Sequence, residues 1–157
     1  MQFQGRYDVI RQSAARPVSV TAMALIEGGD NFHTRYAPAL GAVVGRTFSD
    51  TTAIYASPIW VHNSAALSGV DRDTFVLGLG GRLRVLPTVY VVGEVSPRLA
   101  GYTPGEAEFA FGIEKRAGGH LFQLNVGNSS GTTVGQLARG GFEHTLYLGF
   151  NLSRKFF

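Results

Sequence analysis

The side chains that could carry out chemistry are few and widely spaced along this chain. Its histidines are His33, His62, His120 and His144. No two of them are two or four residues apart, which are the spacings that place a pair of metal ligands on one face of a strand or a helix. The chain has no cysteine, so thiol chemistry, disulfides and cysteine-ligated metals are excluded. We therefore expect neither a metal site nor a cofactor.

A hydrolytic site is the second possibility. The run His62-Asn63-Ser64, with His144 later in the chain, invites comparison with membrane phospholipases, which use a His, a Ser and an Asn on the outer wall of a barrel. A catalytic triad needs side chains that converge from separate parts of the chain. Asn63 and Ser64 are adjacent instead, which favours a polar loop. We expect no enzymatic activity and keep a hydrolase as an alternative.

Charged residues of both signs are interleaved in the middle of the chain. Acid-base catalysis needs two acids isolated together, whereas the inward acids here, such as Glu94, are interleaved with arginines, such as Arg82, Arg84 and Arg98. Arg82 and Glu94 are diagonal neighbours in the expected strand pairing and could form an ion pair. The pattern favours a ladder of charges along one face over a catalytic site.

The composition limits the class of protein. A length of 157 residues suits a single domain, and 45% of the residues are hydrophobic. No apolar run approaches the roughly 20 residues that a membrane helix requires. Only 16% of the residues are charged, which is low for a soluble surface and plausible for an exterior that contacts lipid. The 14 basic residues are scattered, so we expect no nucleic-acid binding.

Alternation of apolar and polar residues with a period of two predicts β-strands along most of the chain. The nine predicted strands span residues 3–11, 17–27, 36–46, 52–62, 74–85, 88–98, 106–115, 120–127 and 145–156. Helical spacing is weak throughout, although residues 132–139 could form one or two helical turns.

The connections between these strands alternate strictly in length. The short ones lie at 13–15, 47–50, 86–87 and 117–119, and the long ones at 28–35, 63–73, 99–105 and 128–144. Transmembrane barrels show this alternation because their periplasmic turns are short and their extracellular loops are long. In the last loop, residues 131–136 lack the Gly-Lys-Ser/Thr end of a phosphate-binding loop. This loop suits a segment that folds over or into the mouth of a barrel.

The hairpin around Gly118 and Gly119 allows a prediction of register. A two-residue turn of the primed type needs positive φ at both central positions, which glycine provides. Such a turn places Ala117 opposite His120 and, further along, Ile113 opposite Leu124. Apolar residues then face apolar residues, so the turn and the alternation agree.

The predicted strands have one polar and one apolar face. The polar face, which we expect to line a lumen, comprises Arg82, Arg84, Glu94, Arg98, Glu108, Glu114, Gln123, Asn125 and Asn151. The apolar face, which we expect to contact lipid, comprises Phe75, Leu77, Leu79, Leu83, Phe111, Ile113, Phe122, Leu124, Leu146, Leu148, Phe150 and Leu152. Alternation alone also fits a soluble ligand-binding β-barrel with an apolar interior. The loop lengths and the low charge favour the membrane.

The last predicted strand has the features of a terminal barrel strand. Apolar residues occupy every second position from Leu146 to Leu152, and the chain ends in aromatic residues. The strand thereby resembles the closing strand of a bacterial outer-membrane β-barrel, in which the terminal Phe is a recognition signal for the barrel-insertion machinery. The candidates for this assembly signal are Gly149, Phe156 and Phe157. In the usual signal the terminal Phe continues the apolar row, whereas Phe157 lies on the other parity.

Five stretches of the sequence carry a family resemblance. They are GLGGRLR at 78–84, PTVYVVGE at 87–94, FGIEKRAGGHLFQLN at 111–125, GTTVGQLARGG at 131–141 and GFNLSRKF at 149–156. Through them the chain resembles the C-terminal portion of a bacterial family of predicted outer-membrane β-barrel proteins, classified as a domain of unknown function. The resemblance implies a fold and a location, and it implies no activity or ligand.

Together these features predict an all-β, antiparallel, up-and-down transmembrane β-barrel, formed as a single domain over residues 1–157. About nine strands lie in this chain. Bacterial single-chain barrels have even strand numbers with both ends periplasmic, so we expect further strands ahead of Met1 in a larger barrel. The start of the chain also has no visible export signal, as this expectation requires.

The expected role follows from the expected fold. We predict an integral protein of the bacterial outer membrane, a channel or a solute-binding barrel with a polar lumen. Its expected partners are outer-membrane lipid and, during insertion, the barrel-assembly machinery. An outer-membrane hydrolase resembling phospholipases and a soluble ligand-binding barrel are the alternatives. The sequence leaves the solute and the oligomeric state open.

Overall fold

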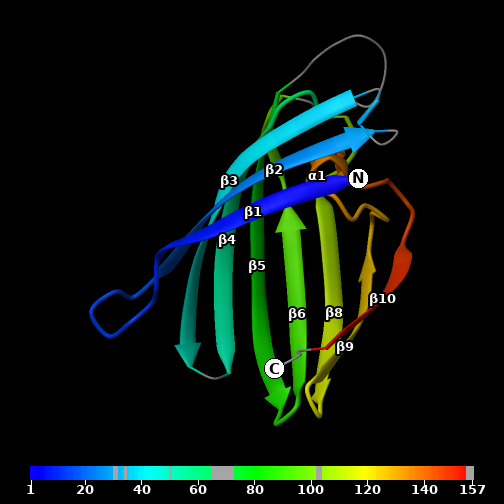
Figure 1. Ribbon diagram of the computed structural model, residues 1–157. Helices are drawn as coiled ribbons and strands as arrows, with labels where there is room; N and C mark the ends of the chain where they lie inside the picture. The colour runs from blue at the N-terminus through cyan, green and yellow to red at the C-terminus, as the bar shows by residue number, and fades with distance from the viewer. Residues whose placement is uncertain (30–31, 34, 50, 65–72, 102–103, 155–157) are drawn as a thin grey trace.

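The computed structural model describes residues 1–29, 32–33, 35–49, 51–64, 73–101 and 104–154, and it is almost entirely β-structure (Figure 1). The strands in this part are β1 (Gln2–Ile10), β2 (Ser19–Gly29), β3 (Arg35–Ser49), β4 (Thr52–Val61), β5 (Thr74–Leu86), β6 (Val89–Ser96), β7 (Arg98–Ala100), β8 (Glu108–Ala117), β9 (His120–Gly127) and β10 (Tyr147–Arg154). The helix is α1 (Val134–Arg139).

The strands form one antiparallel sheet in which neighbours in sequence are neighbours in space. The order is β1-β2-β3-β4-β5-β6-β8-β9-β10, so the predicted up-and-down arrangement is confirmed. All nine predicted strands are present within a few residues of their expected bounds. In the described residues β1 and β10 are the two edges, and the curved sheet does not close into a barrel (Figure 1).

The sequence prediction missed β7, because it continued the sixth strand to Arg98. Proline has no N–H to donate to a strand ladder, so Pro97 ends β6 after Ser96. The chain then turns back to β5, where the Leu77 N–H donates to the Pro97 carbonyl at 3.0 Å. Arg98 is thus at the start of a short separate strand that pairs with β5.

The predicted register of the β8–β9 hairpin is confirmed. Gly118 and Gly119 have φ of 53° and 83°, the left-handed conformation that the primed turn requires. Ala117 pairs with His120, and the register runs without a shift to the far end of the hairpin. The first turn is also tight, because Ser13 and Arg16 exchange two backbone hydrogen bonds.

The small core lies between α1 and one face of the sheet, which we call the inner face. This face carries Val76 on β5 and, six residues later on the same parity, Arg82. The core consists of Met23, Leu25, Ala39, Ile59, Val61 and Val76 from the strands and Ala138 from α1. The predicted helical turn therefore exists and folds against the inner face, near the end of the sheet that bears the long loops (Figure 1). Among the described residues, no helix is both long and apolar enough to cross a bilayer.

Candidate functional site

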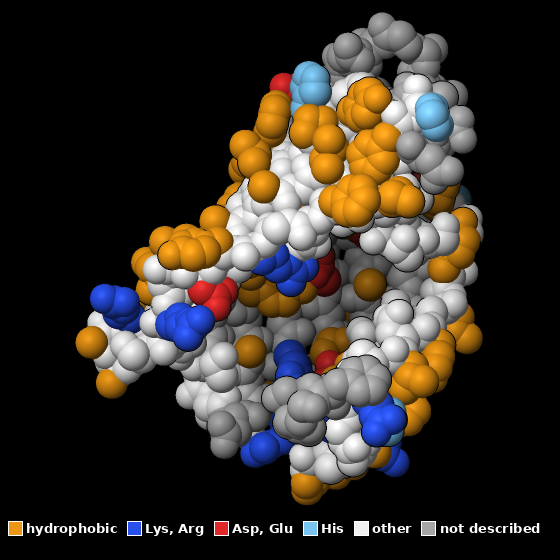
Figure 2. All heavy atoms as spheres, viewed as in Figure 1, with side chains coloured by type: hydrophobic (Ala, Val, Ile, Leu, Met, Phe, Trp, Pro, Cys, Tyr) orange, Lys and Arg blue, Asp and Glu red, His pale blue; other side chains and the backbone are white. Residues whose placement is uncertain are grey.

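Polar side chains gather on the inner face from β5 to β9, as the alternation predicted. Most of the residues expected there are partly buried, namely Arg82, Arg84, Glu94, Arg98, Glu108, Gln123 and Asn125, while Glu114 is buried and Asn151, on the edge strand β10, is exposed. Figure 2 shows acidic and basic side chains inside the hollow of the sheet, with apolar side chains over its outside. The sheet thus brings together most of the predicted set.

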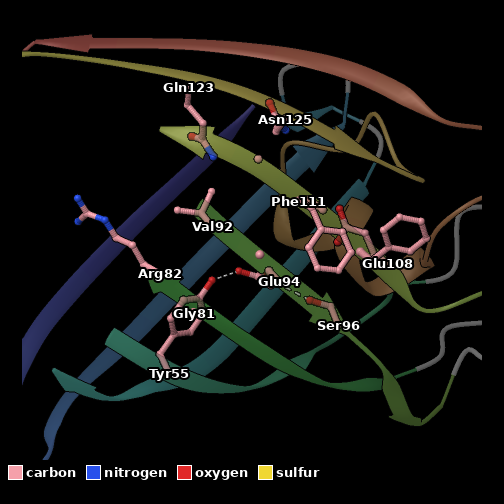
Figure 3. Close-up of a pocket in the computed structure, with 14 residues that line it drawn as sticks. Tyr55, Gly81, Arg82, Val92, Glu94, Ser96, Glu108, Phe111, Gln123 and Asn125 are labelled. Carbon is pink, nitrogen blue, oxygen red and sulfur yellow. Dashed lines mark hydrogen bonds between the residues drawn. The ribbon is translucent and has the colours of Figure 1, made fainter. Parts of the chain in front are cut away.

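Glu94 is the centre of a hydrogen-bonded group. The Tyr55 hydroxyl on β4 donates to one carboxylate oxygen of Glu94, and Ser96 Oγ donates to the other at 3.2 Å (Figure 3). Ser96 is only 1% exposed. Buried polar groups of this kind hold a carboxylate in one orientation, because breaking either bond leaves an unpaired polar atom.

Tyr55 reaches Glu94 across an intervening strand, and a glycine makes this possible. Gly80 on β5 pairs with Tyr55 on one side and with Glu94 on the other. The tyrosine ring lies directly over Gly80, where a Cβ would collide with it. Sequence reasoning missed Tyr55. The available signal was an inward-facing tyrosine opposite a glycine on the neighbouring strand.

The predicted ion pair between Arg82 and Glu94 is wrong. Arg82 Nη2 lies 2.7 Å from Glu114 Oε1, and its guanidinium stacks over the Tyr90 ring with 3.6 Å between Cζ and the ring centroid. Arg82 extends away from Glu94 in Figure 3. Tyr90 is diagonal to Arg82 in the register and directly opposite Glu114, so the arginine finds an aromatic face and a carboxylate together there.

Glu114 also contacts a second cation. Arg116 Nε lies 3.4 Å from the same carboxylate oxygen, and the Arg116 guanidinium is 5.0 Å from the Tyr90 ring centroid. The side chain of Glu114 is 12% exposed, so two nearby arginines compensate for much of the cost of its burial. This group is the charge ladder that the sequence predicted, with partners that the sequence did not identify.

Amides complete the polar surface toward the sheet edge. Asn151 Nδ2 donates to Gln123 Oε1 at 3.3 Å, across the β9–β10 pair. Asn125 lies against Gly149, where a Cβ would come within 2.6 Å of Asn125 Oδ1. Gly149, a candidate for the assembly signal, therefore has a local packing role that the sequence did not suggest.

A cavity of about 390 Å³ opens between these groups (Figure 3). Its polar lining comes from Tyr55, Arg82, Glu94, Ser96, Glu108, Gln123 and Asn125, and its apolar lining includes Val92 and Ala110. The carboxylates accept hydrogen bonds, and the amides can both donate and accept. A small molecule with hydroxyl or amino groups finds matching partners here.

The outer face of the same strands is apolar. Of the residues expected to contact lipid, those exposed are Phe75, Leu79, Leu83, Phe111, Ile113, Phe122, Leu124, Leu146, Leu148, Phe150 and Leu152, while Leu77 is half-buried. Leu148 is 76% exposed. Large contiguous apolar surface of this kind marks a region that contacts lipid or another protein.

The comparisons with known proteins agree with this arrangement. A family model described as a membrane-bound β-barrel domain, DUF5777, matches residues 1–156. The chain belongs to this family. The DUF5777 domain is thus a membrane-bound β-barrel domain of unknown function, which agrees with the antiparallel sheet, its polar inner face and its apolar outer face. No curated protein and no solved structure matches it.

Of the residues compared with a phospholipase site, His62, Asn63 and Ser64 lie in one loop of the DUF5777 domain and each has a hydrogen-bond partner, whereas His144 lies in a separate loop with an exposed side chain. Ser64 is 1% exposed and its Oγ lies 2.5 Å from Thr74 Oγ1. His62 Nδ1 lies 2.6 Å from Asp73 Oδ1. Asn63 Nδ2 donates to the Tyr36 carbonyl at 3.3 Å. These bonds hold the loop to the start of β5 and to β3.

Two further predictions concern metals and assembly. Within the residues that the structure describes, no group of three or more histidines or acids is placed to hold a metal ion. Phe156 and Phe157 lie outside the described residues of the DUF5777 domain. The aromatic end of the assembly signal therefore stays a prediction.

Proposed function

We propose that this domain is an integral protein of the bacterial outer membrane, without enzymatic activity, whose inner face passes or binds a small polar solute. The observation that carries the proposal is the cavity of about 390 Å³, which is lined by fixed polar side chains on the inner face. The opposite face of the same strands exposes large apolar side chains. A membrane barrel has this distribution, with a polar interior and an apolar belt, whereas a soluble barrel has the reverse.

The outer-membrane location is supported by the arrangement of the connections. The short turns after β3, β5 and β8 lie at one end of the sheet, and the strand ends that lead into the longer β4–β5 and β9–β10 connections lie at the other (Figure 1). Bacterial outer-membrane barrels have short periplasmic turns and long extracellular loops. The end with the short turns would accordingly face the periplasm.

The class of solute is inferred from the lining of the cavity. Small-molecule sites usually have volumes of roughly 300 to 1,000 Å³, and this cavity lies within that range. Glu94 and Glu108 give it two carboxylates, while Gln123 and Asn125 add amides. A small solute with hydroxyl or amino groups fits this chemistry better than an anion does, because the nearest arginine, Arg82, is already paired with Glu114.

Lipid and the barrel-assembly machinery are the proposed partners. On the outer face, Lys115 pairs across the sheet with Phe122, and Arg154 pairs with His120. These residues lie beside the short β8–β9 turn, at the border of the apolar belt. Cationic side chains at such a border extend toward lipid phosphates, so this edge suits the headgroup layer.

The proposal is tested by reconstituting the detergent-purified full-length protein in planar bilayers and recording single-channel currents. We expect stepwise conductance with a preference for cations, because carboxylates line the cavity. The double change Glu94→Gln and Glu108→Gln should reduce that preference. Asp8→Asn is the matched control, since Asp8 lies on the first hairpin with an exposed side chain.

Two results would overturn the proposal. One is a protein that remains in the aqueous fraction of cells without detergent. The other is a protein that inserts into bilayers but neither conducts ions nor binds small polyols or amines in equilibrium dialysis.

A further inference from the structure

The loop between β9 and β10 folds inward as an ordered segment, residues 128–141, which we call the inner segment. Its base is closed by Asn128, which is 2% exposed. The Asn128 side chain accepts from the Phe109 N–H and donates to the Ala107 carbonyl, both at 2.9 Å. Its own carbonyl accepts from the Phe142 N–H at 2.8 Å. The two ends of the segment are therefore fixed to β8 and to each other.

The helix inside this segment covers an apolar part of the inner face. Ala138 is fully buried, and Val134 and Leu137 pack against the same core. The strand residues beneath them include Leu25, Ile59 and Val76. In a water-filled interior this surface would be exposed, so the helix supplies the contacts that keep it dry.

A polar anchor holds the beginning of the helix. The Gly135 N–H donates to Glu27 Oε2 on β2 at 2.9 Å, and the Val134 N–H donates to Gln2 Oε1 on β1 at 3.0 Å. Gly135 is buried against the Glu27 carboxylate, so a side chain at this position would displace it. A carboxylate at a helix N-terminus is also favoured by the helix dipole.

A second polar anchor holds the end of the helix. The Arg98 guanidinium on β7 donates to the Arg139 carbonyl at 2.9 Å and to the carbonyls of Gly105 and Glu106 at 2.8 and 2.9 Å. Gly140, with φ of 84°, lies directly over this guanidinium. One arginine thus joins the inner segment to the loop that precedes β8.

We propose that the inner segment is a plug that narrows the interior at its long-loop end, and that release of the Glu27 and Arg98 anchors opens the path. The helix has six residues, and helices of fewer than about 12 residues are not stable alone in water. Its position therefore depends on tertiary contacts. Loss of one anchor should allow the helix to leave the inner face without unfolding the sheet, since the segment joins the strand pairing only at its two ends, Asn128 and Gly141.

The assignment of this segment as a plug rests on the proposed function, because a plug requires a solute path. Its position is therefore tested first with a readout that does not depend on conductance. Ala138→Cys places a thiol at a fully buried position of the plug. We expect slow reaction with a membrane-impermeant maleimide in liposomes. Adding Glu27→Ala should raise the rate about tenfold, the factor expected when a hydrogen bond to a charged group is lost. Glu143→Ala is the matched control, because Glu143 is exposed in the same loop.

Conductance then tests what the plug controls. Replacing residues 130–139 with a Gly-Ser linker should increase the unitary conductance several-fold. Arg98→Gln should increase the fraction of time that the protein spends in the state of larger conductance. An unchanged conductance in the linker variant would overturn the plug while leaving the proposed function intact. Fast labelling of Ala138→Cys in the otherwise unchanged protein would also overturn it. Slow labelling at position 138, together with no conductance in the unchanged protein or in the linker variant, would support the buried position of the segment. It would overturn both the solute path and the control of that path by the plug.

Discussion

At the scale of single residues, the ion pair between Arg82 and Glu114 is the polar contact whose loss should cost the most stability. Their side chains are 29% and 12% exposed, so solvent screens them incompletely. Glu114→Gln should lower the free energy of unfolding by about 1.5 to 3 kcal/mol, since Arg82 then lacks its carboxylate. Urea unfolding in lipid vesicles measures this change.

An exposed pair on the first hairpin is the control for that prediction. Arg11 and Asp8 form an ion pair whose side chains are 86% and 51% exposed. Asp8→Asn should cost less than about 1 kcal/mol, because solvent screens such pairs. Equal losses of unfolding free energy in Glu114→Gln and Asp8→Asn would contradict the prediction, because they would mean that water screens the inner-face pair as fully as the exposed pair.

Adjacent residues on β9 report on the two faces of the sheet. Leu124 is 51% exposed on the outer face, and Asn125 is partly buried on the inner face. Leu124→Arg should cost roughly 2 to 4 kcal/mol if its position lies near the bilayer midplane. Asn125→Arg should cost less, because Glu94 and Glu108 line the same cavity. Unfolding in vesicles compares the two, and the reverse order would contradict the assignment of the faces.

At the scale of elements, β5 carries two inward-facing glycines, Gly78 and Gly80, that differ in the space beside them. A Cβ on Gly80 would collide with the Tyr55 ring, whereas a Cβ on Gly78 would meet its nearest atom, Ser57 Cβ, at 3.4 Å. Gly80→Ala should lower stability by about 1 to 3 kcal/mol through overpacking. Gly78→Ala should change it by less than about 1 kcal/mol.

The same pair of variants tests the hydrogen bond that Gly80 permits. Displacement of the Tyr55 ring in the Gly80 variant should break its bond to Glu94, and Tyr55→Phe should have the same effect on the cation preference of the current. Similar conductance properties in the Gly80 variant, the Gly78 variant and the unchanged protein would mean that the orientation of Glu94 is set elsewhere.

At the scale of the whole molecule, solvent contact distinguishes a membrane barrel from a soluble one. A dye on a cysteine at position 124 should be quenched by a lipid-borne quencher in liposomes and shielded from aqueous reagents. A cysteine at position 125 should react with a small water-soluble maleimide from the interior. Aqueous labelling at 124 without unfolding would reverse the inside and outside of the sheet.

Much of the fold follows from the sequence because it depends on local signals. Alternation with a period of two determined the nine main strands, and the glycines at 118 and 119 determined the register of the β8–β9 hairpin. Once register is known, parity assigns each side chain to a face, so the polar set from Arg82 to Asn125 could be predicted. The short strand β7 was missed because its partner, β5, is distant in sequence and is reached only after Pro97 interrupts β6.

Only the tertiary structure decided which polar side chains meet. Arg82 joins Glu114 because Tyr90 pairs with Glu114 across β6–β8 and lies diagonal to Arg82 across β5–β6. Tyr55 reaches Glu94 because Gly80 leaves room between them. Each of these contacts depends on the register of several strand pairs and on the direction in which a long side chain extends. The inward position of α1 is decided in the same way, since its partners on β1, β2 and β7 lie far away along the chain. Periodicity specifies the face on which a residue lies, whereas the identity of its partner depends on how the distant strands are assembled.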